Sequence, residues 1–350
     1  MKIAKIFGLC CLAAVGCTGF TSCNEDIVEE QYQHYVGFKA PLDTEGNSVG
    51  VTTIYVPYTR HDENDKPLLY EAEGISHYDL PVIVAGSTNI ENALTVHIAP
   101  SDTLPILNME RFSASRKDIW YNDMSQFASY DPTVTVAGGT SKALLRIKFD
   151  FRNIDLADKY VLPLTIAETP DCGYQRNPLK NFATAMLRVL PYTMFSGTYN
   201  TQMKSHIINT SVADEEGAAL NSIMTYCVGD DKVFFYAGSF NEDSQDRKKF
   251  KVFAQFIPYE QGGNRGTVVL SSENPDMHLQ QVGTATYTIL EVDDEVETYV
   301  MRRTVIINDL NYTFTDYVTA PGSSIDYQVS GTMTLERKFN TQMPEEDQIN

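Results

Sequence analysis

Two short segments of the chain combine aromatic rings with polar side chains. One lies at residues 119–123 and the other at residues 259–265. Trp and Tyr rings can lie against the apolar C–H faces of sugar rings, while amide, carboxylate and guanidinium groups bind the surrounding hydroxyls. The sequence therefore predicts two candidate glycan-binding groups, one made of Trp120, Tyr121, Asn122 and Asp123 and one made of Tyr259, Gln261, Asn264 and Arg265.

Each group also has a purely structural interpretation. A lone tryptophan such as Trp120 often covers the edge of a β-sandwich. A tyrosine that precedes a Gly-Gly turn, as Tyr259 does, often only closes a hairpin. The sequence alone leaves both interpretations open.

Residue patterns typical of catalysis or metal binding are absent from the sequence. The six histidines show no metal-ligand spacing, and no nucleophile elbow, phosphate-binding loop or dinucleotide motif occurs. The acidic signature Asp-x-x-Asp-x-Asp-x-Glu of family-18 glycosidases is also missing. Acidic clusters at 62–65 and 293–295 could bind calcium, but their spacing matches no EF-hand and favours solvated turns. We therefore predict no catalytic residue, no metal site and no cofactor.

The N-terminus has the form of a secretory signal peptide. Lys2 and Lys5 precede an apolar stretch that ends at Gly19 and is too short to span a bilayer permanently. Small residues then lead into Cys23, whose thiol can take a diacylglycerol group after cleavage. Cys17 is an alternative attachment site, and a simple cleaved signal with no lipid is a second alternative.

The overall charge restricts the partners of the protein. The chain has 27 basic and 46 acidic residues and a net charge of −19. Such a chain repels phosphate backbones and anionic lipids, which argues against a nucleic-acid partner and leaves the lipid as its contact with a membrane. Only Cys172 and Cys227 lie downstream of the targeting segment, so a disulfide framework is excluded. One bridge between them is possible, although two buried thiols are favoured.

The composition predicts an all-β protein with two domains. The chain contains 20 Tyr and 17 Phe, and short alternating runs rich in Val, Ile and Thr are separated by turn residues. We expect a β-sandwich over residues 34–192. Beyond Pro191, longer runs joined by short turns predict an up-and-down β-barrel over residues 193–338. Residues 1–22 are assigned to the signal, 23–33 to an acidic tether and 339–350 to a disordered tail.

Short motifs in both halves resemble two-domain surface lipoproteins of the Bacteroides group. In these proteins a β-sandwich domain of unknown function, also found fused to family-18 glycosidases, precedes a lipocalin-like domain. The motifs are Tyr35-Val36-Gly37-Phe38, Tyr160-Val161-Leu162-Pro163-Leu164, Pro191-Tyr192, Phe195-Ser196-Gly197-Thr198-Tyr199, Tyr312-Thr313-Phe314 and the segment from Tyr327 to Arg337. In the lipocalin-like pattern, Gly197 would allow a close approach and Arg337 could stack on the aromatic ring of Tyr199.

The resemblance also implies a location and a modification. Glu25 and Asp26, directly after Cys23, resemble the acidic tag that directs such lipoproteins to the outer face of the outer membrane. Asp102-Thr103-Leu104 resembles the Asp-Ser/Thr-apolar acceptor for O-glycosylation in this bacterial group, which makes Thr103 a candidate site.

Membership of this family implies a role in glycan utilisation. The leading hypothesis is a non-catalytic, surface-exposed glycan-binding lipoprotein that works beside an outer-membrane glycan importer or glycosidases. The alternative is a structural or assembly component that docks on such a transporter or enzyme and binds no sugar. An enzyme of unrecognised type ranks lowest, because no residue constellation supports it. A shared fold does not by itself decide between these roles.

Overall fold

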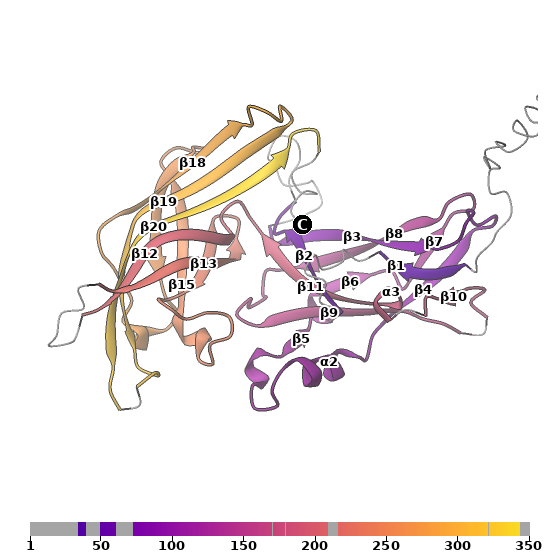
Figure 1. Cartoon of the computed structure of the whole chain (residues 1–350), viewed down its shortest axis with the longest axis horizontal. Helices are drawn as coiled ribbons and strands as arrows, with labels where there is room; N and C mark the ends of the chain where they lie inside the picture. Colours follow the sequence, from indigo (N-terminus) through magenta and orange to yellow (C-terminus); the bar gives the residue numbers. More distant parts are fainter. Residues whose placement is uncertain are drawn as a thin grey trace, which may run out of the picture.

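The computed structural model describes residues 34–39, 50–60, 73–169, 171–178, 180–208, 216–320 and 322–343. Figure 1 shows two domains side by side, an N-terminal pair of sheets and a C-terminal barrel, which confirms the predicted all-β fold class. The signal (1–22), Cys23 and the tether, the acidic cluster 62–65 and residues 344–350 lie outside the described residues. In the part described, no helix has the length and apolar character needed to cross a membrane.

The N-terminal domain is a sandwich of two sheets. One sheet contains, in spatial order, β10 (Gln175–Arg176), β1 (Tyr35–Phe38), β3 (Ile75–Val84), β8 (Lys142–Asp150) and β6 (Ala128–Tyr130). The other contains β2 (Val51–Pro57), β11 (Thr184–Tyr192), β9 (Lys159–Ile166), β4 (Leu94–Pro100) and β7 (Thr133–Val136), with β5 (Tyr121–Asp123) paired to β9. Fully buried side chains such as Leu162, Leu187 and Ile147 meet between the sheets. This packing follows from strands whose side chains alternate between two faces.

Strand β9 is buried on both faces because a short helix covers its outer side. Leu162 and Leu164 face the sandwich core, whereas Val161 packs against Leu104 of α2 (Leu104–Arg111) and against Tyr121. The connection from α2 to β6 contains the short helices η1 (Lys117–Ile119) and η2 (Ser125–Phe127), and α3 (Lys180–Ala183) precedes β11. The segment between α2 and β6 therefore lies on the outside of the sandwich.

The C-terminal domain is a closed antiparallel barrel of eight strands. The strands are β12 (Gly197–Ile207), β13 (Ala218–Gly229), β14 (Lys232–Tyr236), β15 (Lys251–Pro258), β16 (Arg265–Ser271), β18 (Ala285–Asp293), β19 (Val300–Asp316) and β20 (Ile325–Asn340). Strand β20 pairs with both β12 and β19 and closes the sheet, while β17 (Gln280–Gln281) adds to β19. Two short helices, η3 (Arg247–Phe250) and η4 (Pro275–Met277), lie in the loops. Strand β20 includes residues 339 and 340, which the sequence analysis assigned to the tail.

Aromatic side chains fill the interior of the barrel. Tyr199 and Tyr312 are fully buried, and the rings of Phe195 and Phe256 stack with their centroids 3.9 Å apart. Large buried rings inside an eight-stranded barrel occupy space in which many lipocalin-like barrels hold a small ligand. The interior of this barrel is therefore a packed core.

The lipocalin-like motif at the barrel floor is present with one difference. Gly197 has a φ of +132°, and a Cβ at this position would lie 3.2 Å from Arg337, so the glycine does permit a close approach. The guanidinium of Arg337 lies 5.6 Å from the centroid of the Tyr192 ring and donates hydrogen bonds to carbonyls of the linker 193–196. Arg337 therefore stacks on Tyr192 and not on Tyr199, because the ring of Tyr199 is enclosed in the barrel core.

Both cysteines of the described part are free thiols. Cys227 is buried and packs with the sandwich core although it belongs to a barrel strand. Cys172 is only half-buried, and its Sγ lies 3.0 Å from the Thr169 hydroxyl. The bridge that the sequence left open is absent between these residues, and the burial favoured for both thiols holds for Cys227 alone.

Candidate functional site

The first predicted group lies at the end of η1, and the structure separates its members. Trp120 is half-buried, its Nε1 donates to the Ser113 carbonyl (3.3 Å), and Lys117 Nζ lies 5.5 Å from the ring centroid. Asn122 and Asp123 are exposed. The Asp123 carboxylate accepts hydrogen bonds from the amide and the hydroxyl of Ser125 in the next turn, so Asn122 has the freest side chain of the group.

Tyr121 belongs to the interior and does not share the exposed surface of its neighbours. Its side chain is 5% exposed and packs edge-on against Phe112, with centroids 5.2 Å apart. The side chain of Asn108 in α2 makes two hydrogen bonds of 2.9 Å with the backbone of Tyr121: Nδ2 donates to the Tyr121 carbonyl, and Oδ1 accepts from the Tyr121 amide. Because the ring fills the space beneath α2, it is not accessible to a sugar in this structure.

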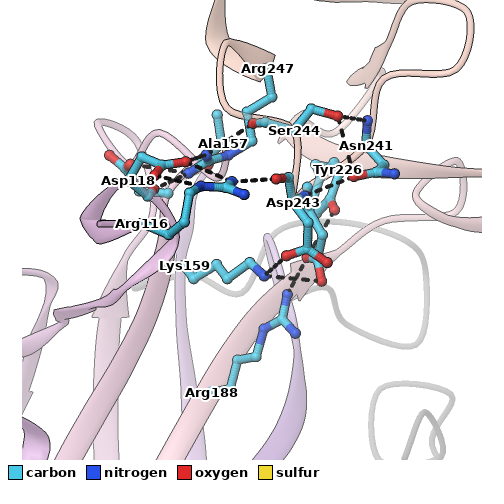
Figure 2. A network of polar contacts seen from close by, with 12 residues as sticks. Arg116, Asp118, Ala157, Lys159, Arg188, Tyr226, Asn241, Asp243, Ser244 and Arg247 are labelled. Carbon is cyan, nitrogen blue, oxygen red and sulfur yellow. Dashed lines mark hydrogen bonds and ion pairs between the residues drawn. The ribbon is translucent and has the colours of Figure 1, made fainter. Parts of the chain in front are cut away.

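The turn that precedes Trp120 is part of the contact between the two domains. Figure 2 shows Arg247 of η3 pointing into this turn, where its Nη2 donates to the Asp118 carbonyl (2.6 Å). Its Nε donates to the Ala157 carbonyl (2.8 Å), and the residue is only 1% exposed. Buried backbone carbonyls need such partners, so Arg247 satisfies two groups of the sandwich from the barrel.

A second set of charges joins the domains beside Arg247. The carboxylate of Glu242 in the barrel accepts one hydrogen bond from Arg188 Nη2 (2.7 Å) and one from the Tyr226 hydroxyl (3.2 Å). Lys159, which is 8% exposed, contacts Glu242 (3.5 Å) and Asp243 (2.6 Å). Figure 2 shows Lys159 and Arg188 of the sandwich pointing toward Tyr226 and Asp243 of the barrel. Burial by itself raises the pKa of Glu242, but the neighbouring Arg188 and Lys159 outweigh it and lower that pKa below its ordinary value.

An apolar cluster completes the domain contact. It contains Leu156 and Ala157 of the sandwich together with four aromatic side chains on the outer face of the barrel: Tyr226, Phe234, Tyr236 and Phe253. Along β14, Val233 and Phe235 face the barrel core while Phe234 and Tyr236 face the sandwich. We therefore define the domain interface as this cluster together with the charged groups around Arg247 and Glu242.

Sequence reasoning missed this domain interface. The available signal was the run Val233-Phe234-Phe235-Tyr236, since four consecutive apolar residues in a barrel strand indicate that both faces are covered. The partners of Arg247 could not have been inferred, because Ala157 and Asp118 are 90 and 129 positions away in the sequence.

The second predicted group occupies the turn between β15 and β16. Tyr259 is 64% exposed, more than any other aromatic side chain in the described part of the chain. Its amide donates to the Arg265 carbonyl (3.0 Å), so the two residues face each other across the hairpin. Opposed residues of an antiparallel pair project their side chains to the same face. Tyr259 and Arg265 therefore lie next to each other on the outside of the barrel.

The hairpin has a defined backbone shape. Gly262 adopts a φ of +73°, which favours glycine in a tight turn. A Cβ on Gly266 would lie 2.1 Å from the Ile257 carbonyl oxygen, so only glycine fits there. The Asn264 carbonyl also accepts a hydrogen bond from the Ile289 amide (2.8 Å), which attaches the turn to β18, the strand next to β16. The exposed side chains of Gln261 and Asn264 stand on this attached turn.

The two predicted groups belong to different domains. The group at Trp120 lies on the sandwich beside the domain interface, whereas the group at Tyr259 lies on a barrel hairpin. The second group alone combines an open aromatic face with exposed polar side chains on one surface. It is therefore the stronger candidate for contact with a ligand.

Three other features bear on the sequence predictions. Thr103 is the half-buried N-cap residue of α2. Its hydroxyl lies 2.9 Å from the Ser101 hydroxyl and donates a hydrogen bond to Met186 Sδ. Glycosylation of Thr103 stays a prediction. In the acidic cluster at 293–295, Asp294 accepts two backbone amides of its own turn. A shallow groove of about 560 Å³ on the sandwich has only aliphatic and small polar lining residues, Ile83 to Asn89 and Ser141. This groove offers no ring on which a sugar could stack.

Two family models match the chain. A domain of unknown function (DUF4973) matches residues 27–170, and a model described as a C-terminal domain matches residues 183–334. No curated protein is significantly similar to the chain.

Solved structures from Bacteroides resemble about nine tenths of the chain. An auxiliary nutrient binding protein from Bacteroides thetaiotaomicron VPI-5482 is 36% identical with a TM-score of 0.78, and the match covers 91% of this chain and 99% of that one. A protein of unknown function from Bacteroides ovatus is 37% identical (TM-score 0.75; 90% and 98% covered). A multidomain protein including DUF1735, also from Bacteroides ovatus, is 36% identical (TM-score 0.74; 90% and 98% covered). The two-domain arrangement is thus shared over nearly the full length of these proteins.

Proposed function

Because the chain belongs to the family of two-domain Bacteroides proteins that includes an auxiliary nutrient binding protein, we propose that it is a non-catalytic glycan-binding protein. The observation that carries this proposal is the exposed ring of Tyr259, which lies opposite Arg265 on a hairpin whose turn also carries the exposed side chains of Gln261 and Asn264. An aromatic face with polar groups around it is the arrangement that a sugar ring requires.

The packed barrel supports a ligand that binds from outside. Since Tyr199, Tyr312 and the stacked Phe195 and Phe256 fill the interior, a small molecule cannot enter there without displacing the core. A polymeric glycan needs no enclosed cavity and can lie along an outer surface. The exposed hairpin at Tyr259 suits a ligand of that kind.

Glycan binding can be tested by isothermal titration of the mature chain against host N-glycans, mucin O-glycans and plant polysaccharides. We expect binding to at least one class and a loss of about tenfold or more in affinity for Tyr259→Ala, because the ring supplies the stacking surface. Tyr299→Ala is the matched control, since Tyr299 is also an exposed tyrosine on a barrel turn. Trp120→Ala measures the contribution of the first group.

Absence of binding to every glycan of a broad panel would contradict the proposal. In that case, co-purification of an outer-membrane importer or a glycosidase with the double variant Trp120→Ala/Tyr259→Ala would favour the assembly role instead. If Tyr259→Ala binds the glycan with unchanged affinity and Trp120→Ala loses most of its affinity, the binding site lies on the sandwich.

We also propose that the protein is held on the outer face of the outer membrane by a lipid on Cys23. The support is the apolar signal that ends in this cysteine and the acidic residues Glu25 and Asp26 behind it. Cys23→Ser should release the protein from the membrane fraction, whereas Cys17→Ser should leave it attached. Mass spectrometry of the mature N-terminus checks the modification directly; the opposite behaviour of the two variants would assign the lipid to Cys17.

A further inference from the structure

Arg265 is the one arginine without a partner in the part of the chain that the structure describes. That part contains all twelve arginines of the sequence. The other eleven make a hydrogen bond, an ion pair or a contact with an aromatic ring. The guanidinium of Arg265 is exposed and makes no such contact.

This is unusual in a chain of such acidity. With 46 acidic and 27 basic residues, a surface arginine has many carboxylates available to it. Arg152 and Arg146, for example, are more than half exposed and still form pairs of 2.5 and 2.8 Å with aspartates. The turn that precedes Arg265 carries Glu260, which is also exposed and does not pair with it. The five donors of Arg265 are therefore available to a ligand.

The surroundings of Arg265 show what it could bind. On one side it faces Tyr259 across the hairpin, and on the other it is paired in register with Thr288 of β18. Side chains in such a row lie about 5 Å apart on one face of the sheet. A sugar ring stacked on Tyr259 would thus bring its substituents next to the Arg265 guanidinium and the Thr288 hydroxyl. Exposed Ile257 and Leu290 border the row and supply apolar area.

On the basis of the proposed function, we propose that the ligand of this hairpin is an anionic glycan. A carboxylate or sulfate group of the ligand binds Arg265, and a sugar ring lies on Tyr259. Arginine suits this role because its planar fork binds two oxygens of a carboxylate or sulfate at once. The amides of Gln261 and Asn264 remain for the neutral hydroxyls.

The test compares matched charged and neutral sugars with the intact mature chain. Titrations use sialylated and desialylated N-glycans, free and methyl-esterified oligogalacturonates, and 3′-sulfated and unmodified lactose. We expect the charged member of at least one pair to bind about tenfold more tightly or better, with an advantage that shrinks as salt is added. The arm that responds distinguishes a carboxylate from a sulfate.

Variants of the arginine assign the effect to this residue. Arg265→Gln should abolish the preference for the charged sugar, and Arg265→Lys should restore part of it. Arg302→Gln is the matched control, because Arg302 is an exposed barrel arginine already paired with Asp294 and Glu336. This variant should bind both the charged and the neutral sugar with unchanged affinity. Equal binding of charged and neutral sugars, or a preference that survives Arg265→Gln, would overturn this inference and leave the proposed function intact. Failure of every sugar to bind would remove the proposed function and this inference together.

Discussion

Replacing Arg247 by alanine should lower the free energy of unfolding by about 3–5 kcal/mol, which makes it the most damaging single change that we predict. The side chain is almost fully buried between the domains and donates to the carbonyls of Ala157 and Asp118. Removal leaves both carbonyls without their donor, and it also leaves a cavity of the size of the arginine stem. The loss falls on the domain interface and not on either core.

The experiment has a built-in reporter and a neighbouring control. Trp120 is the single tryptophan and follows the turn that Arg247 contacts, so its fluorescence reports on the interface during urea unfolding. Lys248→Ala is the control, because Lys248 is on the same short helix, has a 49% exposed side chain and makes one ion pair with Asp158. Lys248→Ala should lower the free energy of unfolding by about 0–1 kcal/mol. Similar unfolding midpoints for the two variants would contradict the structural role assigned to Arg247.

In a strongly destabilised interface the two domains should also unfold separately. For Arg247→Ala we expect the fluorescence change of Trp120 to precede the loss of β-sheet circular dichroism. In the unmodified protein the two signals should coincide, as for one cooperative unit.

Glu242→Gln should be the second most harmful change, with a loss of about 2 kcal/mol at neutral pH. Glutamine keeps the shape and an oxygen acceptor, but it removes the charge that faces Arg188 and Lys159. Lys159 retains Asp243, so the loss is smaller than for Arg247. Glu291→Gln is the control and should have little effect, because the Glu291 side chain is 40% exposed in its pair with Arg303.

The same residue makes the stability of the interface depend on pH. Arg188 and Lys159 lower the pKa of Glu242 below its ordinary value of 4.5 even though burial opposes them. The unfolded chain then binds this proton more readily than the folded one, so the contribution is complete above pH 4.5 and is lost as the pH falls through the lowered pKa. The difference in stability between the natural chain and Glu242→Gln should therefore be constant at neutral pH and shrink in acid.

Urea unfolding from neutral to acidic pH measures this difference. Other carboxylates with lowered pKa values, such as Asp118 beside Arg116, affect both proteins equally and cancel in the comparison. A difference that stays constant down to the acid limit would show that Glu242 is not the titrating group.

The outcome for each candidate residue follows from the range of the interactions that place it. Alternation of apolar residues marks a strand and its two faces, and the Gly-Gly sequence after Tyr259 marks a hairpin, because both depend on near neighbours. The exposure of Tyr259 could be anticipated for that reason. The burial of Tyr121 could not, since it depends on the position of Asn108 and Phe112 above β9.

The sequence by itself determined the all-β class, the order of a sandwich before a barrel, and the aromatic and polar groups of the β15–β16 turn. Neighbouring strands of an up-and-down barrel are neighbours in the chain, so local pattern is sufficient to order them. Only the tertiary structure decided that the barrel interior is closed, that Phe234 and Tyr236 face the sandwich, and that Arg247 is buried while Arg265 is free. The physical reason is that a side chain's burial and charge pairing depend on what the fold brings against it. For these residues the decisive neighbours come from other strands or from the other domain.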